Sequence, residues 1–304
     1  MTKYTYRSLE KMWVDGYLNF LKKNIDKDYA WDSISGNPSI TWEIVNEYPD
    51  LPWNYCGLSY NPNITIDIIK NNLDKEWRWD NISLNHNITW KNVQDNIEFD
   101  WYWDDLVCNP NITWDIIQQD PHFRYCHSIS ENPNITWDII KNNPDINWNW
   151  YELSNNPNIT LEIIQNNPQI TWNMYKVSCN SSITWDIINE NPDIRWNWDG
   201  ISQNINITWE IIQSNLDKPW EWRYVSTNPN ITWEIIENNP QYEWYWMDEG
   251  IADNPMDLGR LKWIDRKRLE IIKAFQIQRH WRNCTCNPVY SLARRLVLQR
   301  AEIE

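Results

Sequence analysis

The sequence predicts an all-α protein, an αα solenoid of about nine to ten two-helix repeats of 24 residues with divergent terminal caps. The main observation is the motif Asn-Pro-Asn-Ile-Thr-Trp-acid-Ile-Ile, which returns after 24 residues in seven of eight intervals and after 23 in the other. A second observation is aromatic content, since 25 of the 304 residues are Trp and only 6 are Gly. A segment this short cannot bury its apolar face alone, so each copy must stack on its neighbours. The copies begin at Asn37, Asn61, Asn85, Asn109, Asn132, Asn156, Asn180, Asn204 and Asn228.

The first half of each copy predicts a short helix. Counting its first Asn as position 1, Thr occupies position 5 in all nine copies, as a helix N-cap does. Ile at position 4 and an apolar residue at position 9 have the spacing of a hydrophobic staple. Position 7 is acidic in eight of nine copies, which the helix dipole explains better than a bound cation would. Where positions 12 and 13 are Asn-Pro, as at 143–144, this pair is predicted to end the helix, with Asn expected in the left-handed conformation.

The second half of each copy predicts another short helix, entered through Trp at position 17. An aromatic residue or Met at position 19 and an aliphatic residue at position 22 share one helix face. A strand is the second choice for the Trp-x-Trp alternation, because each alternation is only three residues long. Stacked helix layers would give a rod or superhelix on the order of 80–90 Å long. The copy at 109–131 lacks one residue and predicts a local kink or groove.

The ends of the chain depart from the repeat, which divides it into an N-terminal cap and half-repeat at 1–36, the tandem repeats at 37–256 and a basic C-terminal segment at 257–304. The N-terminal segment predicts a longer helix capped by Ser8. The C-terminal segment predicts an amphipathic helix over roughly 260–282. We favour a role for this helix in closing the apolar end of the array, but a basic helix can also contact an acidic partner or a membrane surface. Residues 277–282 match the opening of a calmodulin-binding Ile-Gln motif, although Asn283 and Asn287 replace its later Gly and basic residue.

Charge is distributed unevenly along the chain. The net charge of −15 combines +6 over 257–304 with −21 over 1–256, so the acidic body should repel nucleic acid and anionic membranes. No segment has the run of about eighteen apolar residues that a spanning helix needs. The six cysteines do not recur with the repeat as a disulfide framework would, which favours a reducing compartment and a chain that is not secreted.

No catalytic set, cofactor site or metal site emerges from the sequence. His280, Cys284 and Cys286 resemble half a zinc site, but the Cys-x-Cys spacing is unusual and a fourth ligand is missing. The recurring Asn-x-Thr sequons are better explained by turn chemistry than by glycosylation. The Asn at position 1 is expected to form a hydrogen-bonded ladder between neighbouring copies. Most Trp residues recur at fixed positions and are therefore expected in the core rather than stacked on sugars or bases.

The motif, together with the tail Ile-Gln-Arg-x-Trp-Arg, resembles the short tandem-repeat proteins of Mimivirus-like giant DNA viruses that infect amoebae and related algae. The resemblance covers about residues 24–290. It implies a viral protein located in the host cytoplasm, in the virion, or in both. It carries over no catalytic residue, and departures from the motif such as Ile66 and Leu161 therefore alter no assignment.

The expected function is that of a non-enzymatic scaffold that binds a viral or host protein along one face. Position 20 varies between copies while positions 1, 4, 5 and 17 hardly change, and variable outward positions on a constant frame suit partner-specific contacts. The alternative is binding of a glycan or other ligand through exposed Trp and Asn. The candidate partner-binding residues are Asp80, Asp104, Tyr151, Tyr175, Asp199 and Arg223.

Overall fold

The computed structural model describes residues 6–23, 31–246, 250–251 and 254–286, with all side chains in these ranges except those of 6–8, 22, 124–125, 257–259, 261 and 279–286. The described residues form nineteen α-helices and two 3-10 helices and no strand, so the all-α prediction is confirmed and the strand alternative is wrong. By internal contacts the chain divides into a larger unit, 20–258, and a smaller unit made of 1–19 and 259–304.

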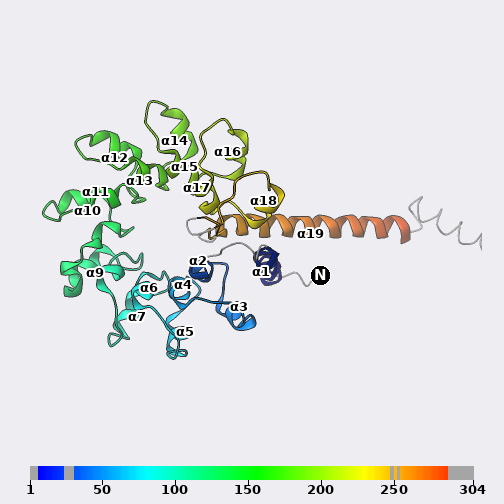
Figure 1. Ribbon diagram of the computed structural model, residues 1–304, viewed down its shortest axis with the longest axis horizontal. Coiled ribbons are helices and arrows are strands. Elements are labelled where there is room, and N and C mark those ends of the chain that lie inside the picture. The colour runs from blue at the N-terminus through cyan, green and yellow to red at the C-terminus, as the bar shows by residue number, and fades with distance from the viewer. Residues whose placement is uncertain (1–5, 24–30, 247–249, 252–253, 287–304) are drawn as a thin grey trace, which may run out of the picture. The chain divides into compact units, whose positions relative to one another are not determined.

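Short helices follow one another in chain order through the larger unit (Figure 1). The first helices of the copies are α3 (Trp42–Glu47), α5 (Ile66–Lys70), α7 (Trp90–Gln94), α9 (Trp114–Gln119), α10 (Trp137–Asn142), α12 (Leu161–Asn166), α14 (Trp185–Glu190), α16 (Trp209–Ser214) and α18 (Trp233–Asn238). The second helices are α2 (Trp31–Gly36), α4 (Tyr55–Tyr60), α6 (Trp79–Leu84), α8 (Trp103–Leu106), α11 (Trp150–Leu153), α13 (Met174–Cys179), α15 (Trp198–Gln203) and α17 (Trp222–Thr227). Second helices pack on one another between successive copies, as α4 does with α2 and α6.

The first helices begin as the sequence predicts but end differently. In all nine copies the Thr hydroxyl accepts a hydrogen bond from the amide three residues later, as Thr136 does from Ile139 at 3.3 Å. The expected left-handed Asn at the end is wrong, because Asn143 has φ −129° and Met256 is the one non-Gly residue of the described part with positive φ. The end is fixed by the Asn143 side chain, whose Nδ2 donates to the Ile139 carbonyl at 2.7 Å. The Asn side chain thus donates the hydrogen bond to a carbonyl of the last helical turn, which a backbone N–H would donate in a left-handed turn.

The second helices begin two residues after the position-17 Trp, which confirms that these Trp residues precede the helix. Each of the eight indoles donates from Nε1 to the carbonyl at position 12 of its own copy, as Trp172 does to Asn167 at 3.1 Å. Ser at position 23 is buried and links copies: the Ser154 hydroxyl accepts the amide of Asn173 in the next copy at 3.0 Å. The indole therefore ties together the two halves of a copy, and the serine ties each copy to the next.

The position-1 asparagines form the expected ladder. Asn204 is fully buried, and its Nδ2 lies 2.8, 3.0 and 3.1 Å from the carbonyls of Ser178, Asn180 and Ile183. Its Oδ1 accepts the amide of Asn206 at 2.8 Å. The position-3 asparagines extend the ladder, since Asn206 Nδ2 donates to the carbonyls of Ser181 and Ile183. The sequon amides thus have a structural partner, as turn chemistry predicts.

The two ends of the ladder meet. Asn37 Nδ2 donates to the carbonyl of Asn254 at 2.9 Å, although 217 residues separate them. Lys23 Nζ also pairs with Glu237 at 2.7 Å, and the ring centroids of Phe20 and Trp246 stack 5.7 Å apart. Of the two expected shapes, a rod or a superhelix, the straight rod is therefore wrong for residues 20–258, because successive copies turn enough for the first to reach the last.

The shortened copy at 109–131 replaces its second α-helix by two 3-10 helices, η1 (Pro121–Tyr125) and η2 (Ser128–Glu131). Phe123 is buried there, and the His122 ring stacks on Trp103 with centroids 4.0 Å apart. A cavity of about 470 Å³ beside this copy is lined by residues including Cys126, His127 and Trp148. The predicted local irregularity is thus present as a change of helix type with an adjoining groove.

The smaller unit pairs parts of α1 (Tyr6–Lys23) and α19 (Asp257–Cys286). Trp13 and Trp263 are buried and meet edge to face, with centroids 5.5 Å apart, and Arg260 lies 3.6 Å from Glu10. Helix α1 begins at Tyr6, so the Ser8 cap is wrong: Ser8 lies within the helix. The predicted C-terminal helix is confirmed and extends further at both ends.

Candidate binding surface

The outward side of the second helices carries the variable residues of the repeat. Position 22 and, in most copies, Ser at position 23 are buried, as in Ile201 and Ser202. Positions 20 and 24 are exposed or half-buried, and position 21 lies where neighbouring second helices meet, so that Gly57 and Gly200 are buried there. We call the residues at these three positions of successive copies the second-helix row. Of the six residues predicted from position 20, Asp104, Tyr151 and Arg223 are exposed, and Asp80, Tyr175 and Asp199 are half-buried.

Neighbouring copies contact one another along this row. Asn81 Nδ2 donates to the Cys56 carbonyl at 2.9 Å, and Lys176 Nζ pairs with Glu152 at 3.0 Å. Each of these contacts joins residues that lie 24 or 25 positions apart in the sequence. The row is therefore a continuous surface across copies rather than a set of separate patches.

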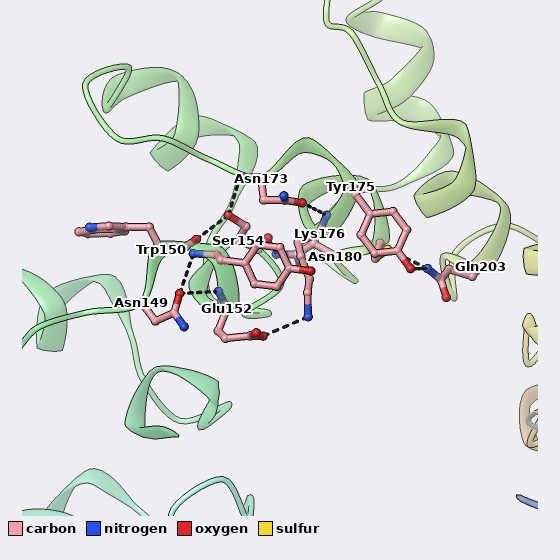
Figure 2. Close-up of polar contacts among 11 residues, drawn as sticks. Asn149, Trp150, Glu152, Ser154, Asn173, Tyr175, Lys176, Asn180 and Gln203 are labelled. Atoms are coloured by element: carbon pink, nitrogen blue, oxygen red, sulfur yellow. Dashed lines mark hydrogen bonds and ion pairs between the residues drawn. The ribbon is translucent and has the colours of Figure 1, made fainter. Parts of the chain in front are cut away.

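The centre of the row is a cluster of tyrosines around an ion pair (Figure 2). Lys176 Nζ lies 4.9 Å from the Tyr151 ring centroid while it pairs with Glu152, and the Lys176 and Glu152 side chains are about four-fifths buried. The Tyr175 hydroxyl accepts a hydrogen bond from Gln203, and burial raises the pKa of Tyr175 to about 12. These groups offer a partner a protonated phenol, an aromatic face and a partly shielded ion pair, which suit protein contacts.

The N-terminal half of the row is acidic. Burial, followed by the charges of Asp80 and Asp104, raises the pKa of the Asp105 carboxyl. Burial and the charge of Glu152 likewise raise the pKa of Glu131. Asp80 differs, because the Arg78 guanidinium at 2.8 Å lowers the pKa of that carboxyl. Carboxylates of consecutive copies thus repel one another, which favours a cationic partner here.

A cavity of about 680 Å³ lies at the N-terminal end of the row and is formed by the first copies together with Pro255. Its lining includes Cys56, Tyr60, Asn81 and His86. The volume lies within the range of small-molecule and anchor-residue pockets. The structure thus brings together Cys56, which occupies position 20, and His86, which replaces the usual Pro.

Three half-buried cysteines carry thiols of low reactivity. Burial raises the pKa of the Cys108 thiol to about 12 and those of Cys126 and Cys179 to about 11, so these thiols stay protonated at neutral pH and are weak nucleophiles. No cluster of three or more metal-binding side chains occurs within the described part of the chain. His280, Cys284 and Cys286 lie outside the described side chains, so the structure gives no geometry for the half zinc site.

Sequence reasoning missed the contribution of positions 21 and 24. Glu152 pairs with Lys176, and Gln203 donates to the Tyr175 hydroxyl (Figure 2), yet only position 20 was singled out. Positions 20, 21 and 24 are spaced i, i+1 and i+4 on a helix, and all three vary between copies. Helical spacing applied to the variable positions would have identified them.

Comparisons with protein-family models, curated proteins and solved structures found no match to this chain. Within the described residues, no helix has both the length and the apolar character needed to cross a membrane. The function must therefore be argued from the surface itself.

Proposed function

We propose that this chain is a non-enzymatic scaffold, a solenoid of about nine to ten 24-residue repeats that binds another protein through the second-helix row. The observation that carries the proposal is the contrast between a frame of repeated hydrogen bonds and an outward row whose residues change from copy to copy. The ladder asparagines, the capping threonines and the indole contacts recur almost unchanged. The residues of the row do change between copies, and they contact one another across copies, so the row is a surface that can distinguish one partner from another.

The two halves of the row specify the kind of partner. The acidic half attracts a basic segment, and the tyrosine cluster offers aromatic anchor contacts of the type that dominate protein interfaces. The cavity of about 680 Å³ at the N-terminal end is large enough to receive an anchor side chain. Because residues 1–256 carry a net charge of −21, nucleic acid is a poor partner for this surface.

The second candidate, glycan binding, needs rows of solvent-facing Trp with adjacent amides. Every Trp whose side chain is described is buried or half-buried, and the indoles at position 17 donate to backbone carbonyls. The ladder amides are likewise engaged with backbone groups. These observations favour the protein partner over the glycan.

The resemblance to tandem-repeat proteins of giant DNA viruses supports a viral origin as part of the same proposal. It would place the chain in the host cytoplasm, in the virion, or in both, with a viral or host protein as its partner. The row itself does not depend on this origin.

The proposal is tested by affinity purification of two triple variants from cells in which the chain is made. The row variant combines Tyr151→Ala, Tyr175→Ala and Lys176→Ala. The control combines Asp138→Ala, Lys141→Ala and Glu162→Ala, all exposed on the first helices α10 and α12. We expect a stoichiometric protein that wild type and control retain and the row variant loses. Equal recovery with both variants, or no stoichiometric protein with wild type, contradicts the proposal.

A further inference from the structure

Helix α19 leaves a stripe of large apolar side chains in solvent. Leu269, Ile272 and Phe275 are 57%, 43% and 41% exposed and lie three residues apart, so they follow one another along one side of the helix. From Asp265 to Gln278 none of the described side chains is buried. Single exposed apolar residues are ordinary, but a stripe of three on one helix marks a contact surface.

The first turns of α19 pack against α1, whereas the described residues of the same unit do not bury its later turns. Trp263 and Ile264 are buried, with Trp263 against Trp13. Beyond them, Glu270 lies 3.8 Å from Arg266 and 3.0 Å from Lys267 of the same helix. The stripe therefore belongs to a preformed helix, anchored at one end and accessible along its later turns.

The positive charge of α19 indicates which kind of partner surface would cover the stripe. Between Asp257 and Cys286 the helix carries eight Lys or Arg against three Asp or Glu, and Arg268 and Lys273 stand exposed beside the stripe. A surface that fits must be apolar in its floor and acidic at its rim. A basic helix with apolar anchors three to four residues apart is what acidic helix-binding grooves accept.

Pairing with α19 of a second chain is disfavoured by the same residues. A coiled-coil seam through Leu269 and Ile272 would next use positions 276 and 279, which are Gln276 and Arg279. Two helices of equal positive charge would also repel. An anionic membrane would need a wider apolar face than a stripe that Arg268 and Lys273 flank.

We propose that α19 is a target helix for an acidic protein with an apolar groove of the EF-hand type, which opens when Ca²⁺ binds. Leu269, Ile272 and Phe275 enter the groove, and the flanking basic residues face its acidic rim. This interaction goes beyond the second-helix row, because it uses a different unit of the chain and different residues.

The test titrates the full chain with calmodulin, as a probe of this groove chemistry, by calorimetry in 1 mM Ca²⁺ and in excess chelator. We expect a 1:1 complex in Ca²⁺ that weakens at least tenfold in chelator. Leu269→Ala and Phe275→Ala should each weaken it about tenfold or more. Leu73→Ala is the matched control, because Leu73 is 58% exposed, and it should leave the affinity unchanged.

Arg268→Glu combined with Lys273→Glu should also weaken the complex and reduce its sensitivity to salt. Absence of Ca²⁺-dependent binding overturns the proposal, and so does binding that the stripe variants leave unchanged. Sedimentation of the chain alone and flotation with phosphatidylserine vesicles complete the test. A dimer or a vesicle complex that Leu269→Ala abolishes would assign the stripe to that occupant instead. Neither result bears on the row variants, so the two proposals fail separately.

Discussion

Both polar atoms of the position-1 asparagine side chain form hydrogen bonds with backbone groups. In Asn204 the amide nitrogen donates to two carbonyls of the preceding copy, those of Asn180 and Ile183, and to that of Ser178 at the end of the copy before it. The amide oxygen accepts an N–H of its own turn. No other side chain of this size supplies both a donor pair and an acceptor in this geometry. Because the residue is fully buried, water cannot replace these bonds, which explains why Asn begins every copy.

We therefore expect Asn204→Ala to lower the free energy of unfolding by roughly 2–4 kcal/mol, since it leaves buried carbonyls without donors. Asn204→Asp should cost at least as much at pH 7, because a carboxylate of equal size accepts hydrogen bonds but cannot donate them. Urea denaturation followed by Trp fluorescence measures both effects. Asn155→Ala, at an exposed position of the row, is the control and should stay within about 0.5 kcal/mol of wild type.

At the scale of the helix, close approach between second helices depends on a few small residues. A Cβ on Gly57 of α4 would lie 1.8 Å from the Asp32 carbonyl oxygen of α2, which is backbone and cannot move aside alone. Gly200 of α15 stands in the same position of its copy, and its Cβ would lie 2.6 Å from the Tyr175 carbonyl oxygen. Copies with larger residues at position 21 must therefore place their second helices differently.

Gly57→Ala is expected to destabilise the protein by about 1–3 kcal/mol, because α2 and α4 must separate to admit one methyl group. Thermal unfolding by circular dichroism measures the change. Gly36→Ala is the matched control, since its Cβ would sit 3.4 Å from the Gly57 carbonyl oxygen, an ordinary contact. Equal losses for the two variants would show that helix separation is not the cause.

At the scale of the larger unit, the meeting of Asn37 with Asn254 distinguishes a closed array from an extended one. Zero-length carbodiimide coupling should join Lys23 to Glu237, whose charged atoms lie 2.7 Å apart, and mass spectrometry should detect the linked peptides. Lys176 and Glu152, 3.0 Å apart in neighbouring copies, provide the internal control. An extended array would give the control link alone, because its ends would lie on the order of 80 Å apart.

The acidic half of the row makes a prediction about pH. Burial and the charges of Asp80 and Asp104 raise the folded-state pKa of Asp105, so the folded protein binds its proton more tightly than the unfolded chain does. This carboxyl therefore lowers stability as pH rises through its titration. We expect Asp105→Asn to raise Tm by roughly 1–2 °C at pH 7. The gain should shrink as pH falls through the titration of this carboxyl, which takes up its proton more readily in the folded protein than in the unfolded chain. A gain that stays constant across this range would contradict the electrostatic cause.

The sequence by itself determined the local structure of each copy. Thr caps, the position-17 Trp and the position-1 Asn were assigned correctly because their roles depend on residues within one copy or on the same residue of the next. Position 20 was assigned to the surface for a similar reason, since a helix repeats every 3.6 residues. The wrong prediction of a left-handed Asn at the helix ends also concerned a local feature. The Asn side chain makes the hydrogen bond to the helix carbonyl that the left-handed turn was expected to make.

Only the tertiary structure decided how the copies add up. Each copy is rotated relative to its neighbour, and no single motif reveals this rotation. The rotations add up along the array until Asn37 contacts Asn254. Packing between copies also brings Lys176 against Glu152 and Tyr151 of the preceding copy. It likewise places Cys56 and His86 around one cavity. These groups come from different copies, and their distances depend on the packing of helices against helices, which no pattern within 24 residues encodes.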